Sequence, residues 1–541
     1  MTDLSKFLQS AFWKKIQKGL PLLGSLLSAI LLASAFPGSG GNESIIFLAL
    51  VPLMFSVYSA SAKKAALLGL LSGFLFFLIT LSWLHNLTHM VPGIGLKASA
   101  LLGYALLALY CALYFIPFTL MVSACSRRWG IATLRGNLRT MFAVTSVWVA
   151  SEYLRSILFT GFAWNPLGVS QYQSLAIIQI ADLGGIYLIS ACIVWMNTAL
   201  FITLRQYAQG IRNRKYRPHL ELMLGLLPLA LSVAYGFNIL VNRPPLLGES
   251  VRATLIQPNI PQSEKWDAQK DQQIRERLES LTQTAALLGP TDLIIWPETA
   301  LPDFPRSSHS SQQLLRRVVD LGSPLLVGCM DFSFSEEGKR SYYNSSILFG
   351  TNGMQIAKYD KQHLVPFGEY VPFPKLMGSF TPVDVNFTPG TESSLLAVPQ
   401  KPPFSVLICF EDTVAPLALK AVRNGARWLV NQSNDAWFDP SSQSEQHLAH
   451  AVFRCIENRV PMARCCNSGI SCTINPYGEV VRPIQPRSAG SGLVEIRPRP
   501  IGLPSAFYTQ NGDAFAKFSL IAAATAIFVL RMQGRRKKST K

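Results

Sequence analysis

The chain has 541 residues, of which 49% are hydrophobic and 15% are charged. This balance excludes an ordinary water-soluble protein, because soluble domains carry about 25% charged residues. The formal net charge of +18 would suit a nucleic-acid partner. The basic residues, however, crowd into short segments beside apolar runs, which argues against nucleic acid and indicates a membrane protein.

Several apolar runs reach the roughly 20 residues that a helix needs to cross the hydrocarbon core of a bilayer. We expect about eight spans, near residues 20–36, 44–60, 65–84, 99–124, 141–159, 183–204, 222–240 and 515–531. A basic start before the first run also fits a cleavable signal peptide, but the spans that follow favour a retained first helix. The sequence therefore predicts a polytopic α-helical membrane domain over 1–241, with seven spans, and a final span with a basic tail over 514–541.

Lysine and arginine cluster in every second segment between these spans. They precede the first span and follow the second, fourth, sixth and eighth, whereas the loops at 37–44, 85–97 and 160–174 are nearly free of positive charge. Because positive charge is retained on the cytoplasmic side, this pattern places both termini in the cytoplasm. We expect a multi-pass membrane protein, with residues 242–513 on the outer side of the cytoplasmic membrane.

Residues 242–513 are richer in polar residues and proline, and their length suits one globular domain. Short apolar runs predict strands, and helical spacing predicts helices between them. The strands are expected at 251–257, 292–296, 324–329, 343–349, 404–409 and 427–432, and the helices at 267–289, 310–322, 414–425 and 444–459. Turn sequences at 351–353 and 475–479 add two hairpins. The pattern predicts an α/β layered domain with partly antiparallel sheets covered by helices.

Chemically active side chains follow several of these predicted strands. Glu298 ends "DLIIWPE" and Cys409 ends "FSVLIC", while Lys361 and Glu369 lie in "YDKQHLVPFGEYVP". A buried cysteine is most often structural, but a carboxylate away from water needs a partner, and a thiol proton would provide one. A base, a cation and a nucleophile are the parts that an acyl-transfer site requires.

Two other polar pairs lie outside this group. His85 and His89 have helical spacing, but no third ligand accompanies them, so a solvated loop pair is favoured over a metal site. Glu152 and Arg155 lie within or at the edge of the fifth span, where charges are costly, so we expect them to pair with each other. Whether they also contact a lipid head group stays open.

The motifs carry a resemblance to known enzymes. "WPET", "YDKQHLVPFGEYVP" and "ICFED", in this order, resemble the Glu-Lys-Cys triad of the nitrilase superfamily. "HLVPFGEYVP", "NQSNDAWF" and "GFAWNPLGVSQ" (161–171) resemble more closely the apolipoprotein N-acyltransferase family. This resemblance covers nearly the whole chain and implies eight spans, with an extracytoplasmic nitrilase-like αββα sandwich inserted before the last one.

The resemblance also implies residue roles. Cys409 would be the nucleophile, Glu298 the general base that takes the thiol proton, and Lys361 a group that holds the oxyanion. Glu369 would orient this lysine.

Three more residues match positions of the family. Phe410 and Glu411 match the two positions after the nucleophile, and the Phe410 N–H is a candidate oxyanion donor. Trp437 matches a loop residue near the lipid entrance. In one departure from the family pattern, Cys465 and Cys466 stand where a small polar pair is expected; we predict that they are core residues.

The implied reaction is a two-step transfer. An acyl chain would pass from a glycerophospholipid, with phosphatidylethanolamine expected, to Cys409 as a thioester. It would then pass to the α-amine of the N-terminal diacylglyceryl-cysteine of an apolipoprotein. No cofactor or metal is expected, and the expected assembly is a monomer. The apolar loop at 371–387 is predicted either as a mobile arm on lipid or as a packed loop.

Two alternative functions stay open at this point. A membrane-tethered nitrilase-type amidase would use the same triad on a small amide, although it would not need eight spans. A membrane scaffold or transporter with a degenerate outer domain would not need a complete triad, and few charges lie deep in the predicted spans.

Overall fold

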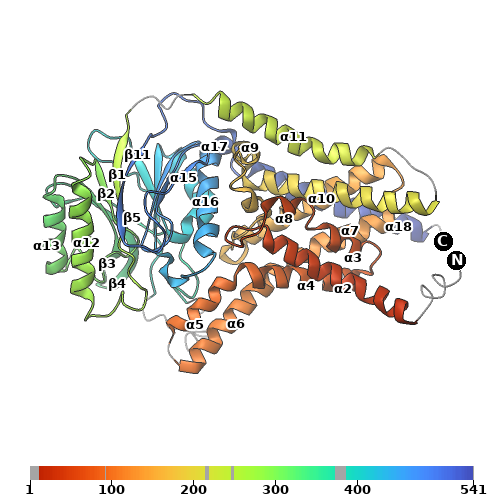
Figure 1. The fold of residues 1–541 in the computed structure, drawn as a ribbon, viewed down its shortest axis with the longest axis horizontal. Coiled ribbons are helices and arrows are strands. Elements are labelled where there is room, and N and C mark those ends of the chain that lie inside the picture. Colours follow the sequence, from red (N-terminus) through yellow and green to blue (C-terminus); the bar gives the residue numbers. More distant parts are fainter. Residues whose placement is uncertain (1–10, 92, 214–218, 245–248, 372–385, 540–541) are drawn as a thin grey trace. The chain divides into compact units, whose positions relative to one another are not determined.

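The computed structural model describes residues 11–91, 93–213, 219–244, 249–371 and 386–539. The chain divides into two compact units (Figure 1). The helical unit comprises Met1–Ser82, Gly103–Val241 and Asp513–Lys541, and the sheet unit comprises Trp83–Leu102 and Asn242–Gly512.

The helical unit is built from helices rich in apolar residues, all of them long except α3 (Val51–Val57). They are α2 (Ala11–Ser34), α3 (Val51–Val57), α4 (Ala62–Thr80), α6 (Gly93–Ala112, whose first half clusters with the sheet unit), α7 (Phe115–Arg128), α8 (Leu134–Ile157), α10 (Ala181–Asn213), α11 (Leu220–Val241) and α18 (Ala514–Ser539). In the described chain, five stretches are long and apolar enough to cross a membrane: Ala62–Thr80, Gly93–Arg128, Ala181–Gly210, Leu220–Val241 and Ala514–Gly534.

The other three predicted spans are not among these five stretches, each for its own physical reason. The apolar part of the first, Gly19–Ser34, is short. The second is divided into a 3-10 helix, Glu43–Phe47, and the short helix α3. The fifth lies in α8, which also carries four charged residues.

The charged pair in α8 differs from its prediction. Glu152 accepts hydrogen bonds from Trp148 Nε1 at 2.7 Å and from the Leu167 N–H at 2.8 Å. Arg155 donates to the Phe162 carbonyl at 2.9 Å. The expected pairing of these two side chains is therefore wrong: each one binds the segment that follows α8, where backbone groups need partners.

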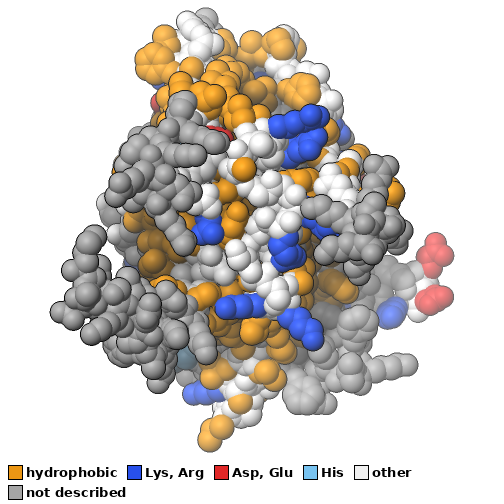
Figure 2. All heavy atoms as spheres, turned by 90° about the vertical axis from the view of Figure 1, so that its right-hand side faces the viewer, with side chains coloured by type: hydrophobic (Ala, Val, Ile, Leu, Met, Phe, Trp, Pro, Cys, Tyr) orange, Lys and Arg blue, Asp and Glu red, His pale blue; other side chains and the backbone are white. Residues whose placement is uncertain are grey.

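The basic segments meet at one end of the helical unit. Arg127 donates to the Ala60 carbonyl at 2.7 Å, and Trp129 donates to Gln533 at 3.0 Å. These contacts bring together the start of α4 and the ends of α7 and α18. Figure 2 shows lysine and arginine side chains among apolar ones on this face, with few acidic groups in view.

The sheet unit contains two mixed sheets. The first has the order β11-β1-β2-β3-β4-β5, formed by β1 (Val251–Gln257), β2 (Leu293–Ile295), β3 (Leu325–Phe334), β4 (Arg340–Phe349), β5 (Gln355–Asp360) and β11 (Gly490–Ile496). The second has the order β10-β9-β8-β7-β6, formed by β6 (Phe404–Ile408), β7 (Trp428–Ser433), β8 (Met462–Cys466), β9 (Cys472–Ile474) and β10 (Val480–Val481). The central strands β1, β2 and β3 run parallel, as do β6, β7 and β8.

The two sheets pack face to face between two layers of helices (Figure 1). The inner core joins Leu255 and Ile295 of the first sheet to Val406 and Val430 of the second, and all four are buried. Helices α12 (Asp271–Ala286) and α13 (His309–Val319) cover the outer face of the first sheet, and α15 (Ala415–Arg423) and α16 (Gln443–Asn458) cover the second. Each sheet thus buries both faces, which gives the αββα sandwich.

Candidate active site

Cys409 lies at a strained corner directly after β6. Its φ of +52° is in the left-handed region, which residues other than glycine seldom adopt. The chain then enters the 3-10 helix Cys409–Thr413. Cys409 is half-buried, whereas the other eight cysteines are all buried. Cys409 is therefore the most exposed cysteine residue of the chain.

The Glu411 carboxylate fixes this corner. It accepts hydrogen bonds from the backbone N–H groups of Ile408 at 2.7 Å, Gln362 at 2.7 Å and His363 at 3.0 Å. The Tyr359 hydroxyl donates to both of its oxygens, at 2.9 and 3.0 Å. Because β5 and β6 belong to different sheets, Glu411 ties the nucleophile corner to the segment that carries the lysine.

Lys361 lies between two acidic side chains. Its Nζ is 2.9 Å from Glu369 Oε1 and 3.6 Å from Glu298 Oε1. Asn344, on β4, donates from Nδ2 to both carboxylates at 2.8 Å. The Val365 N–H donates to the other Glu369 oxygen at 2.8 Å. We call Glu298, Lys361 and Glu369 the triad cluster.

The charges of the triad cluster shift the pKa values of Lys361 and Cys409. Burial by itself would lower the pKa of Lys361, but the carboxylates of Glu369 and Glu298 raise it well above the usual lysine range, so the lysine is a fixed cation. Burial and the negative charge of Glu298 raise the pKa of Cys409 above that of a free thiol. The thiol is therefore protonated at rest, and its reaction needs a base beside it.

A second charged group, which we call the ion cluster, lies against the Cys409 backbone. Arg464 Nη1 is 2.5 Å from Asp412 Oδ2, and its Nη2 is 3.4 Å from Asp435 Oδ2. His447 places Nε2 2.8 Å from Asp412 and Nδ1 3.1 Å from Asp435. The same Nε2 lies 3.2 Å from the Cys409 carbonyl. All four side chains are buried.

The remaining predicted site residues are Phe410 and Trp437. The Phe410 ring stacks on His363 with centroids 5.8 Å apart. Trp437 ends the short 3-10 helix Asp435–Trp437, with 39% of its surface exposed. Its neighbour Phe438 packs edge to face on Trp83 at 4.6 Å. The role of Trp437 at a lipid entrance stays a prediction, and residues 372–385 of the predicted arm lie outside the described residues.

The structure answers the question about the adjacent cysteines. Cys465 and Cys466 are both buried in β8, and the Cys465 thiol donates to the Ile256 and Ile295 carbonyls at 3.3 and 3.2 Å. Burial raises the pKa of Cys465 to about 12. Their prediction as core residues is confirmed.

Sequence reasoning missed several residues of this site. Asn344 follows no recognisable motif, and His447 and Arg464 lie in segments read as ordinary helix or left unassigned. Lys265 lies in the polar run "PQSEKWD", which suggests solvent, yet it is buried with its Nζ 3.1 Å from the Glu298 carbonyl. Only Arg464 carries a signal, since an arginine inside an apolar strand needs buried acidic partners.

A half-buried thiol, a carboxylate and a lysine at the strand ends of an αββα sandwich define a carbon-nitrogen hydrolase type of domain, here in a chain with membrane-spanning helices. In agreement, residues 252–502 match the carbon-nitrogen hydrolase family model. Residues 28–199 match the model of the apolipoprotein N-acyltransferase N-terminal domain.

The relatives define the family further. The apolipoprotein N-acyltransferase of Geobacter metallireducens is 35% identical over 524 residues, which cover 94% of both chains. That of Thermotoga maritima is 28% identical over 520 residues, covering 95% of this chain and 94% of its own. That of Rhodopseudomonas palustris is 29% identical over 474 residues, covering 83% and 85%. The chain belongs to the apolipoprotein N-acyltransferase family, as its motifs predicted, and the amidase alternative is not favoured.

Proposed function

We propose that the chain transfers an acyl chain from a glycerophospholipid, by way of a thioester on Cys409, to the α-amine of an N-terminal diacylglyceryl-cysteine on an apolipoprotein. Family membership implies an acyltransferase with a phospholipid donor and a lipoprotein acceptor. The observation that carries the mechanism is the Cys409 thiol within electrostatic range of a paired carboxylate and lysine.

The first half of the reaction forms the thioester. Glu298 takes the proton of Cys409 as the sulfur attacks the ester carbonyl carbon. Lys361 and the Phe410 N–H stabilise the negative charge on the carbonyl oxygen, with Glu369 holding the lysine in place. The carbon–oxygen bond then breaks, and Glu298 returns the proton to the leaving lysophospholipid oxygen.

The second half regenerates the thiol. The acceptor amine attacks the thioester carbon, a carbon–nitrogen bond forms, and the carbon–sulfur bond breaks. Glu298 takes the amine proton and passes it to the Cys409 sulfur. The acyl group arrives as an ester, so the steps balance without a cofactor. We propose phosphatidylethanolamine as the donor and a monomer as the working form.

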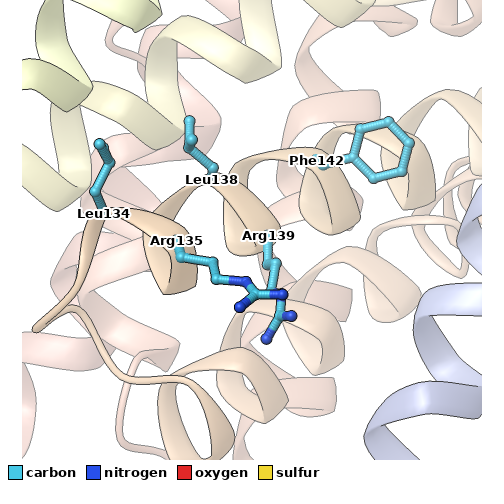
Figure 3. Close-up of a pocket in the computed structure, with 5 residues that line it drawn as sticks. All are labelled: Leu134, Arg135, Leu138, Arg139 and Phe142. Carbon is cyan, nitrogen blue, oxygen red and sulfur yellow. The ribbon is translucent and has the colours of Figure 1, made fainter.

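The orientation in the membrane is also a proposal. We place the basic end of the helical unit in the cytoplasm and the sheet unit in the periplasm, in an inner membrane crossed eight times. In support, a surface cavity of about 430 Å³ on α8 is lined by Arg135, Arg139, Leu134, Leu138 and Phe142 (Figure 3). Two like charges four residues apart repel each other and favour an anionic partner, and anionic lipids are abundant on the cytoplasmic leaflet.

The function can be tested by mass spectrometry of the full-length protein in detergent after incubation with phosphatidylethanolamine. We expect a fatty-acyl increment on the Cys409 peptide that hydroxylamine removes. It should be absent from Cys409→Ala and present in the control Cys465→Ala, whose thiol is buried. A small acyl group would point to an amidase. No acyl group, or one on Cys465 or Cys466, would contradict the proposal.

A further inference from the structure

A second buried lysine lies beside the triad cluster. Lys265 follows β1 and is 2% exposed, although lysine is almost never buried without a charged partner. Its Nζ donates to the Glu298 main-chain carbonyl at 3.1 Å. This bond uses one of the three ammonium donors and fixes the backbone of the proposed base.

The negative charges of this site outnumber its positive charges unless Lys265 is counted. With both carboxylates ionised, Glu298 and Glu369 carry two negative charges, and Lys361 supplies one positive charge. Asn344 bridges the carboxylates without adding charge. A net negative charge in a buried site is costly and opposes formation of a thiolate. A protonated Lys265 balances the remaining negative charge of Glu298, Glu369 and Lys361 taken together.

We propose that Lys265 is a positioning residue of this active site, which holds the Glu298 main chain and supplies the second positive charge against which Cys409 is deprotonated. The proposal rests on the proposed function. In the thioester-forming step the proton moves from the Cys409 sulfur to the Glu298 carboxylate. Lys265 keeps its own proton, and no bond to it changes.

Lys265 is a cation that titrates near neutrality. Burial lowers its pKa to about 8, although the negative charges that Glu298 and Cys409 can carry oppose this shift. The charged groups that face it are Glu298 after β2 and Cys409 after β6, with Lys361 and Glu369 linked to it through Glu298. Its positive charge is present below about pH 8 and lost above it. The electrostatic stabilisation that this charge gives to a Cys409 thiolate should be lost over the same range.

The test measures the alkylation of Cys409 by iodoacetamide as a function of pH, read on the Cys409 peptide. It uses the full-length protein in detergent, with Lys265→Met, Lys265→Arg and, as a control, the exposed Lys420→Met. In the unmodified protein we expect the rise of the rate with pH to flatten near pH 8. Lys265→Met should react about 10-fold to 100-fold more slowly at pH 7 and show no break at pH 8, since one pKa unit of the thiol is a tenfold change. Lys420→Met should behave like the unmodified protein.

The arginine variant separates charge from folding. Lys265→Arg keeps the charge at all accessible pH values, so we expect a rate near that of the unmodified protein at pH 7 and no break at pH 8. An unchanged rate and break in Lys265→Met would overturn the proposal. If the methionine variant does not fold, an unshifted break in Lys265→Arg would overturn it equally. Because alkylation needs no phospholipid, failure of the acyl-transfer proposal would appear separately, as absence of the acyl thioester in the unmodified protein.

Discussion

The triad cluster acts electrostatically on the Cys409 thiol and the ion cluster contacts its backbone, but the two clusters differ in how completely their charges are matched. In the ion cluster, two carboxylates meet an arginine and a histidine, and every side chain is at most 1% exposed. In the triad cluster, Glu298 and Glu369 are 9% and 12% exposed at their side chains and share the donors of Lys361 and Asn344. The ion cluster, with two acidic and two basic side chains, contacts the Cys409 backbone. The triad cluster has two carboxylates for one lysine, which leaves a carboxylate able to take a proton.

The largest expected difference in stability is between two variants that each remove one cation, one from each cluster. Arg464→Met should lower the free energy of unfolding by about 3–5 kcal/mol, because two buried carboxylates lose one of the two cations that they share. Lys361→Met should abolish acylation while costing clearly less stability, since its carboxylates are nearer to solvent. Urea unfolding in detergent, followed by tryptophan fluorescence, measures the free energy of unfolding of both variants, and the acyl increment on the Cys409 peptide measures acylation. Equal losses would mean that the two clusters do not differ in this way.

The histidine of the ion cluster predicts a dependence of stability on pH. Burial and the charge of Arg464 oppose protonation of His447, but Asp412 and Asp435 outweigh them and raise its pKa to about 9. The unfolded value is about 6.5. The stabilisation is therefore complete below about pH 6.5 and is lost as pH rises to 9, by an amount on the order of 3 kcal/mol.

Thermal unfolding midpoints between pH 6 and 9.5 check this dependence. The unmodified protein should lose stability over that range, and His447→Gln should show a flatter curve. The same slope in both proteins would assign the effect to other groups.

The smallest effect on stability is expected outside both clusters. Trp437 is 39% exposed, so Trp437→Ala should lower the free energy of unfolding by about 1–2 kcal/mol, because only part of a large apolar side chain leaves a buried environment. If it lies at the lipid entrance, acylation by long-chain phospholipid should slow while iodoacetamide alkylation of Cys409 stays unchanged. Slowing of both reactions would place its effect at the thiol and contradict the predicted role.

The predictable part of the fold lies where each segment carries its own signal. The six apolar runs predicted as strands correspond to β1, β2, β3, β4, β6 and β7, and the four helical segments to α12, α13, α15 and α16. The strand β8, "MARCC", was missed because Arg464 interrupts its apolar run, and the partners of this charge come from segments about 30 and 50 residues away.

The residues of the candidate site also divide into those that the sequence predicts and those that it does not. Glu298 and Cys409 could be predicted because each follows an apolar strand, and Lys361 because its motif resembles a known family. Asn344 and Lys265 could not, since their roles arise only when β4 and the segment after β1 come to lie beside Glu298. Hydrogen bonds between distant segments leave no periodic pattern in a sequence.

The bonds of Glu411 join β6 of one sheet to the segment after β5 of the other. The nucleophile and the lysine therefore keep their spacing only while the two sheets hold their relative position. Any sliding of one sheet over the other would separate the reactive pair before the hydrophobic core opened. Catalytic activity is thus a sensitive measure of how the two sheets are aligned, and heating should inactivate the enzyme before it unfolds.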